Sequence, residues 1–261
     1  MKKILFLTVL FVCLQTVLNA QSVYTQTSIE EVIKKGINPM DVGDLRVDAI
    51  KEKTFLHHLG KFKRLNNFTI SNCDTLPKEI FEFKFVRSIR IIGGVKAFPN
   101  GAYEKLAYLT EIDIERMKDK KGELSSLPDD FGKLPTLKKF YAASNNLTRF
   151  PMALTKIISL EIMVLADNKI PTIPKEIGNL KFITDIALGG NPIKVIPKEI
   201  GLLKNLTTLD LLETLVDGIP IELSQISTLN FLAIPAGKIT KEYTTEFKKK
   251  CVNKSIAVVR Y

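Results

Sequence analysis

The chain repeats itself every 23 residues over much of its length. The hexapeptide IPKEIG occupies residues 173–178 and again 196–201. Apolar anchor residues recur at the same spacing at Leu137, Leu160, Ile183, Leu206 and Leu229. A period of about 20 to 30 residues marks a stack of small units, none of which can bury its apolar face alone. The sequence therefore predicts one repeat solenoid, although 261 residues would otherwise suggest one or two ordinary domains.

Each unit has the same internal pattern. In the unit that begins at Leu160, apolar residues follow at Met163 and Leu165, and this alternation predicts a strand. Asn168 follows where the chain turns inward, and its amide can both donate to and accept from backbone groups that water cannot reach. Pro174 then favours a loose or helical return segment, and we expect Gly178 to permit a sharp bend back.

The period extends in a weaker form toward the amino end. The step from residue 109 to 137 is 28, because five extra residues fall in the segment 115–128. Nine units begin at residues 42, 65, 86, 109, 137, 160, 183, 206 and 229. Ser28 and Glu31 form a capping-box start, so the segment 28–36 should be a short helix. We expect a signal peptide over 1–20, an amino-terminal cap over 21–41, a solenoid over 42–239, and a carboxy-terminal cap of helix and strand over 240–261.

The pattern LxxLxLxxNxLxxLPxxIxxL resembles the leucine-rich repeat. Its 23-residue IPKEIGNLKF form is similar to repeats in secreted bacterial proteins, notably those of pathogenic spirochaetes. The resemblance covers about residues 42–239 and implies an α/β horseshoe, with a parallel sheet on the concave side and irregular or short helical convex segments. It also implies a non-enzymatic scaffold that binds a protein. Gly94, Met117 and Thr214 stand where asparagine is expected, and Cys73 and Ile50 do so in the two most eroded units.

Alternate strand residues should form the concave surface. At these positions the amino-terminal half is polar and charged, and the carboxy-terminal half is small and apolar. Exposed apolar surface often marks a contact, so we predict a partner-binding face here, although half-burial by neighbours and self-association are alternatives. The predicted partner-binding residues are Tyr141, Ile162, Val164, Asp185, Asp210, Leu212 and Phe231.

A second candidate patch is acidic. Three acids occupy alternate positions of one strand and so share a face, beside lysines of the inserted segment. The patch comprises Glu111, Asp113, Glu115, Lys120 and Lys121. Such a patch could attract a hard cation or a basic peptide, or it could be an ordinary solvated surface.

The amino terminus resembles an export signal. Lys2 and Lys3 precede an apolar run over residues 4–14, and Ala20 suits a cleavage site. The run is shorter than the roughly 20 apolar residues of a membrane span. We therefore expect a protein that is secreted or held in the cell envelope, with no membrane span. Loss of the two lysines lowers the net charge from +10 to +8. This surplus keeps open an alternative partner class, polyanions such as glycans or anionic lipids.

No motif in the chain indicates catalysis, a metal site or a cofactor. His57 and His58 fall on a return segment and should be a surface pair. Cys73 and Cys251 lie about seven units apart, or roughly 34 Å at a strand spacing of about 4.8 Å, so we expect two separate thiols. We expect a protein ligand, no nucleic acid, and a monomer or a weak homo-oligomer.

Overall fold

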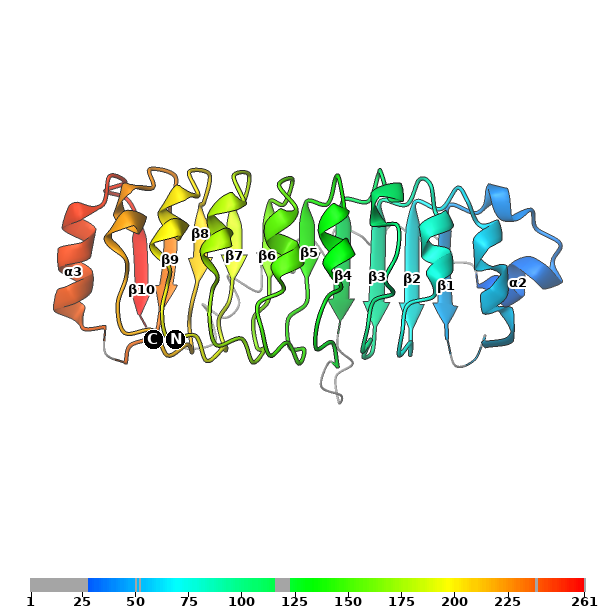
Figure 1. Ribbon diagram of the computed structural model, residues 1–261, viewed down its shortest axis with the longest axis horizontal. Coiled ribbons are helices and arrows are strands. Elements are labelled where there is room, and N and C mark those ends of the chain that lie inside the picture. The colour runs from blue at the N-terminus through cyan, green and yellow to red at the C-terminus, as the bar shows by residue number, and fades with distance from the viewer. Residues whose placement is uncertain (1–27, 50, 52, 116–122, 238, 261) are drawn as a thin grey trace.

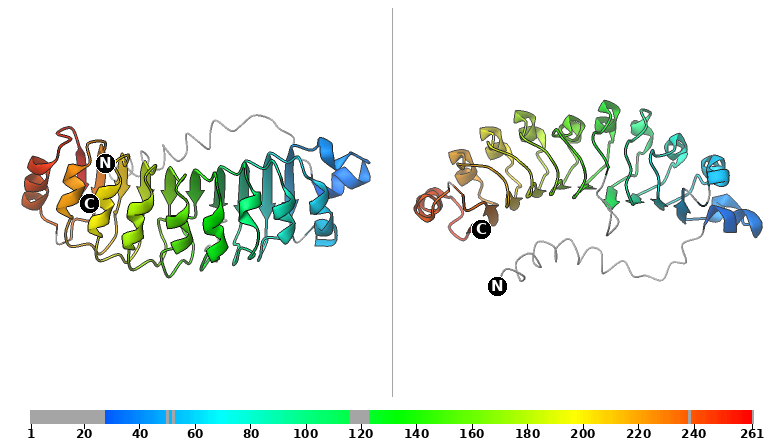
Figure 2. Two further views of the ribbon diagram at one scale, coloured as in Figure 1. Left: turned by 45° about the horizontal axis from the view of Figure 1, so that its top comes forward. Right: turned by 90° about the horizontal axis from the view of Figure 1, so that it is seen from below.

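The protein is a single curved stack of coils (Figures 1 and 2). The computed structural model describes residues 28–49, 51, 53–115, 123–237 and 239–260. Ten parallel strands form one sheet in chain order, β1 to β10. They are β1 (Asp44–Asp48), β2 (Asn67–Ser71), β3 (Ser88–Ile92), β4 (Glu111–Glu115), β5 (Lys139–Tyr141), β6 (Ile162–Val164), β7 (Asp185–Ala187), β8 (Thr208–Asp210), β9 (Phe231–Ile234) and β10 (Ala257–Arg260).

The return segments are 3-10 helices. Figure 2 shows the sheet on the inner side of the arc and these helices on the outer side. Most of them begin directly after a proline, such as Pro174 and Pro197, as predicted for the return segment. The described residues contain η1 (Pro39–Asp41), η2 (Lys53–Lys61), η3 (Lys78–Glu82), η4 (Tyr103–Lys105), η5 (Asp129–Lys133), η6 (Met152–Lys156), η7 (Lys175–Asn179), η8 (Lys198–Leu202) and η9 (Ile221–Gln225).

The strands begin two residues after each predicted anchor, and their register follows the period. Asp185 pairs with Ile162 and with Thr208, each 23 residues away. The longer fourth unit keeps the same register, because Glu111 pairs with Lys139 across 28 residues. The sheet therefore places equivalent positions of successive units side by side, whatever the length of the connecting chain.

The side chains alternate as the sequence predicts. Leu160, Met163 and Leu165 are all fully buried, whereas Val164 is half-buried and faces outward between them. The same pattern repeats from unit to unit, so that one apolar core runs the length of the stack. Burying such aliphatic side chains contributes about 1.5–3 kcal/mol each, which is the main term that holds the coils together.

A ladder of buried asparagines closes the turn after the strands. Oδ1 of Asn191 accepts a hydrogen bond from the Ile170 N–H of the preceding coil at 2.9 Å, and Asn168 does the same for Leu147 at 3.0 Å. Asn145 makes a longer contact of this kind, 3.4 Å, with the Leu124 N–H. These amides satisfy backbone groups that water cannot reach, which confirms the role predicted for them.

The glycines of the IPKEIG repeats have a different role from the predicted one. Neither Gly178 nor Gly201 has a positive φ, so neither serves a left-handed bend. Instead, a Cβ at Gly201 would lie 2.9 Å from the Glu222 carbonyl oxygen and 2.4 Å from the Glu222 Cβ. Successive return segments therefore approach so closely that only a hydrogen fits between them, and the expectation of a glycine bend was wrong.

Both ends of the stack carry helices. Helix α2 (Ile29–Lys34) starts at Ser28, whose side chain accepts from the Glu31 N–H at 3.1 Å, and it buries Ile29 and Val32. At the other end, α3 (Lys241–Lys250) precedes β10, which pairs with β9. The predicted boundaries of cap and solenoid stay predictions, and the predicted signal peptide lies outside the described residues.

Candidate binding site on the concave face

The outward strand residues form rows across the concave face. One row contains Tyr141, Val164, Ala187 and Asp210, which are aligned by direct pairing of β5 to β8. A parallel row, two residues earlier on each strand, contains Lys139, Ile162, Asp185, Thr208 and Phe231. Because neighbouring strands lie about 4.8 Å apart, side chains in one row are close enough to act on one ligand together.

The predicted partner-binding residues fall into two groups. Tyr141, Ile162 and Val164 lie together on β5 and β6, and each is half-buried. Phe231, on β9, is three strands from Ile162, or roughly 14 Å. Leu212, the second residue after β8, lies on the Phe231 side. The structure thus does not form one continuous apolar patch from these residues.

Two aspartates separate the groups. Asp185 on β7 accepts from the Thr184 hydroxyl at 2.7 Å. Asp210 on β8 accepts from the Leu212 N–H at 2.9 Å. Burial raises the pKa of Asp210, the hydrogen bond from Leu212 opposes this shift, and the charges of Asp167 and Glu213 add to it. A ligand that spans both apolar groups would therefore need a polar or positively charged segment between them.

Several positions that should face outward are buried. Ala233 is 0% exposed, and Thr69 and Ser71 are below one-tenth exposed. Their side chains are short, so the neighbouring strands on each side cover them. At Ser71 the hydroxyl also lies 3.4 Å from the Val47 carbonyl oxygen, which it can donate to. The accessible concave surface is therefore smaller than the alternation of the sequence suggested.

The acidic patch is largely paired with bases. Nε of Arg90 lies 3.3 Å from Asp113 and 3.6 Å from Glu115, and Nζ of Lys139 lies 3.6 Å from Glu111. Burial raises the pKa of Asp113 to about 7, the charge of Glu115 adds to this, and Arg90 opposes it. Within the described ranges, no three His, Cys, Asp or Glu side chains are placed so that they could hold a metal ion. Lys120 and Lys121, the remaining predicted members, lie outside the described residues.

The two histidines lie on the return helix η2, where the sequence placed them. Their rings are 3.8 Å apart, His57 is exposed and His58 is partly buried. Burial, followed by the charges of His57 and Lys61, lowers the pKa of His58. Both predicted thiols, Cys73 and Cys251, are free and buried.

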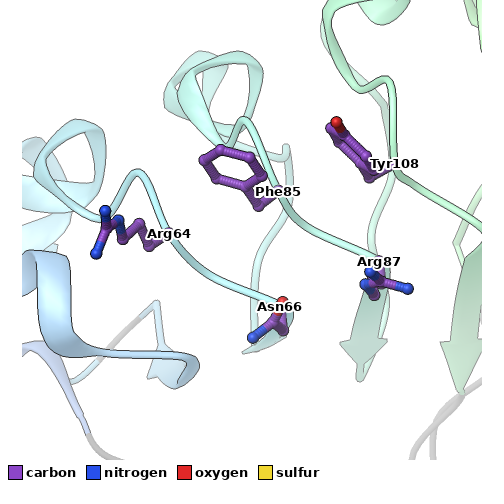
Figure 3. Close-up of a pocket in the computed structure, with 5 residues that line it drawn as sticks. All are labelled: Arg64, Asn66, Phe85, Arg87 and Tyr108. Carbon is purple, nitrogen blue, oxygen red and sulfur yellow. The ribbon is translucent and has the colours of Figure 1, made fainter.

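A surface hollow lies at the edge of the sheet where the strands begin, and the sequence pattern did not point to it. Its volume is about 390 Å³, and its lining is Arg64, Asn66, Phe85, Arg87 and Tyr108 (Figure 3). Arg64, Phe85 and Tyr108 share one repeat position, directly before the anchor. A column drawn at that position would have revealed arginine or an aromatic residue in three successive units, where most other units have a small polar residue and one has Phe182.

Known structures resemble this arrangement of coils. A leucine-rich repeat protein of Leptospira interrogans superposes with a TM-score of 0.73 at 24% identity, over 90% of this chain and 58% of its own. An internalin of Listeria monocytogenes superposes at 0.60 with 14% identity, over 78% of this chain and 56% of its own. The chain has the leucine-rich repeat fold. A chain in the Toll–Spätzle complex of Drosophila also carries it, with a TM-score of 0.58 and 21% identity over 68% of this chain and 24% of its own.

The leucine-rich repeat fold is what these similarities establish. The chain spans less than three-fifths of the length of the Leptospira and Listeria proteins. No protein-family model and no curated protein sequence matches it. Among the helices of the described residues, none has the length and apolar character needed to cross a membrane.

Proposed function

We propose that this protein is a non-enzymatic scaffold that binds a partner protein on its concave face. The observation that carries the proposal is the group formed by Tyr141, Ile162 and Val164 on β5 and β6. These apolar side chains stand on an open sheet face, where polar residues would fold equally well. The leucine-rich repeat fold supports the same function, since in the Toll–Spätzle complex a chain of this fold occurs together with another protein.

The polar surroundings suggest how such a partner would be oriented. On one side of the apolar group lie Lys139 and the acidic patch, and on the other lie Asp185 and Asp210. An apolar centre with a charged rim is typical of protein interfaces, where the centre supplies affinity and the rim supplies orientation. We infer that the partner presents an apolar side chain to Tyr141 and Val164 and basic groups to the flanking carboxylates.

The proposal is tested by charge reversal at the centre of the group. Tyr141→Glu/Val164→Glu places two carboxylates on paired strand positions. Val195→Glu is the control, because Val195 is 67% exposed between β7 and η8. Wild type and both variants are used to capture proteins from a mixture of extracellular proteins at low and high salt, with quantification by mass spectrometry.

A partner that survives high salt, binds the Val195→Glu control and is lost with the double variant supports the concave site. Equal capture by all three proteins, with unchanged circular dichroism, refutes it. Light scattering is measured in parallel. If the double variant only changes the oligomeric state of the protein, the face serves self-association instead.

We also infer that the protein is exported and acts outside the cytoplasm or in the cell envelope. The support is the positively charged start, the short apolar run and Ala20 at its end. Amino-terminal sequencing of the protein recovered from the producing cells tests this inference. A new amino terminus near residue 21 is expected, and an intact Met1 in the recovered protein refutes it.

A further inference from the structure

The hollow lies at the edge of the sheet where β2, β3 and β4 begin, and its residues differ in type from most residues along the rest of this edge. In several other units a small polar residue stands directly before or after the anchor and bonds to the neighbouring coil, although Phe182 occupies the same position before Ile183. Thr136 donates to the Leu109 carbonyl oxygen at 3.0 Å, Ser159 to that of Leu137 at 2.8 Å, and Thr207 to that of Thr184 at 3.0 Å. At the hollow, Arg64, Asn66, Phe85, Arg87 and Tyr108 occupy these positions, and the side chains of the two arginines and the two aromatic residues make no such bond to another described residue.

The two arginines have free guanidinium groups. Both side chains are exposed, and within the described part of the chain neither takes part in a hydrogen bond or an ion pair. Elsewhere along this edge, Lys138 is paired with Glu161 at 2.8 Å. Of the acids nearby in sequence, Glu82 lies 3.9 Å from Lys63 and so is already opposite a cation. The hollow therefore presents positive charge on two guanidinium groups, whose donors suit anionic oxygen atoms.

The two aromatic rings form a platform beside this charge. Phe85 and Tyr108 are 45% and 51% exposed, with ring centroids 5.7 Å apart and ring planes tilted by 34°. Figure 3 shows Arg64, Phe85 and Tyr108 on three successive turns, with Asn66 and Arg87 beside them at the starts of β2 and β3. A planar base inserted between two rings needs about 7 Å, twice the contact distance of about 3.5 Å. The spacing excludes such a slot and leaves the outer faces and edges of the rings for contact.

We propose that this hollow binds an acidic sugar, a pyranose that carries a carboxylate or a sulfate. The C–H face of the sugar would lie on Phe85 and Tyr108, because the negative faces of aromatic rings attract weakly positive hydrogens. Its anionic group would bind the guanidinium group of Arg64 or that of Arg87, which Figure 3 shows pointing away from each other, and Asn66 would bond to a hydroxyl group. The volume of about 390 Å³ falls in the range of ligand sites, about 300–1,000 Å³. This site is separate from the concave face and could be occupied together with it.

Calorimetric titration tests the proposal with three tetrasaccharides at low salt. A heparin fragment carries sulfate and carboxylate, a hyaluronan fragment carries carboxylate alone, and chitotetraose is neutral. We expect at least one acidic fragment to bind, and chitotetraose to bind about tenfold more weakly or not at all. Comparison of the two acidic fragments decides which anion the arginines prefer.

Two double variants locate the binding. We expect two double variants each to lower the affinity for the acidic tetrasaccharide by about tenfold or more. They are Arg64→Gln/Arg87→Gln and Phe85→Ala/Tyr108→Ala. Arg149→Gln/Lys194→Gln removes the same charge from exposed positions in other coils and should change the affinity less than about twofold. The four substituted side chains of the hollow are exposed, so the variants should keep the wild-type melting temperature.

Three results would overturn the proposal. One is that neither acidic tetrasaccharide binds the wild-type protein. Another is that the Arg149→Gln/Lys194→Gln control loses as much affinity as Arg64→Gln/Arg87→Gln, which would mean that binding depends only on the net charge of the protein. The third is that single-stranded oligothymidylate binds more tightly than either acidic tetrasaccharide and that this binding depends on the same four residues. That result would assign the hollow to a nucleic acid.

Discussion

Nδ2 of Asn191 lies 2.9 Å from the carbonyl oxygen of Leu165, a residue of the preceding coil, and donates a hydrogen bond to it. The same amide group bonds to Leu188 in its own coil at 2.9 Å, while its oxygen accepts from Ile170. One side chain thus joins two coils at a depth where it is 1% exposed. A stack of coils has few contacts between distant parts of the chain, so such neighbour-to-neighbour bonds determine its cooperativity.

Replacement of Asn191 by alanine should destabilise the protein by about 3 kcal/mol. The change leaves the buried Ile170 N–H and Leu188 carbonyl oxygen without their partner, and each such group costs about 1–3 kcal/mol unless water enters. The Leu165 carbonyl oxygen keeps its bond from Asn168. Urea unfolding measures the effect. Asn179→Ala, at an exposed position of η7, is the matched control and should shift the free energy of unfolding by less than about 0.5 kcal/mol. Equal effects of the two changes would contradict the ladder.

Gly201→Ala should destabilise the stack by about 2 kcal/mol, because the new methyl group would overlap Glu222 of the next coil. The backbone oxygen that it meets cannot move aside without displacing η9. Gly60→Ala provides the comparison, since a Cβ at Gly60 meets no atom within 4 Å. Thermal unfolding of both variants checks the prediction, and a Gly201→Ala protein as stable as Gly60→Ala would refute the close approach of the return segments.

Asp113 should make the stability depend on pH between about 4 and 7. Its pKa is raised to about 7 in the folded protein, mainly by burial and by Glu115, from about 3.9 in an unfolded chain. The folded state therefore retains a proton that the unfolded state releases, so this group lowers the free energy of unfolding as the pH rises through that window. Above about pH 7 the contribution of Asp113 to the free energy of unfolding no longer changes with pH.

The Asp113→Asn variant cannot titrate at this position. The free energy of unfolding of the variant, minus that of wild type, should rise between pH 4 and pH 8 by up to about 4 kcal/mol, at about 1.4 kcal/mol per pKa unit. Urea titrations at the two pH values measure the difference. A difference that stays level, or falls as the pH rises, would contradict the raised pKa.

Cys73 and Cys251 should be unreactive in the folded protein. They are 6% and 2% exposed, and burial raises the pKa of both thiols, that of Cys73 to about 11. At pH 7 a maleimide should label neither residue in buffer and both in guanidinium chloride, because only the exposed thiolate reacts. Mass spectrometry of the labelled peptides measures this. A peptide in which Cys73 is joined to Cys251 would be incompatible with the stack.

The sequence period was sufficient to predict the sheet. Each predicted anchor is followed by a strand, and the pairing of Glu111 with Lys139 agrees with the five extra residues assigned to that unit. Inward and outward residues were predicted correctly at Val164 and Leu165, since alternation along a strand is a property of the backbone alone. The buried asparagines followed from the need to satisfy backbone groups in a turn.

Features that depend on distances between coils could not be predicted in this way. Gly201 occupies the repeat position of Gly178, for which the sequence predicts a bend, and sequence position does not show how closely Glu222 approaches. Ala233 and Thr69 were assigned to the surface, yet short side chains are covered by the strands beside them. The hollow around Phe85 and Tyr108 was missed because it combines residues from three coils, and the apolar period says nothing about the polar columns next to it.

The unbroken register between β4 and β5 determines where the chain can accept insertions and deletions. The sheet aligns coils by their anchors, so residues added beyond the end of β4 do not shift any other pair. Insertions at this corner can therefore be gained, lost or exchanged while the rest of the stack keeps its arrangement. The corner is a natural position for new sequence in evolution, and for a reporter peptide in the laboratory.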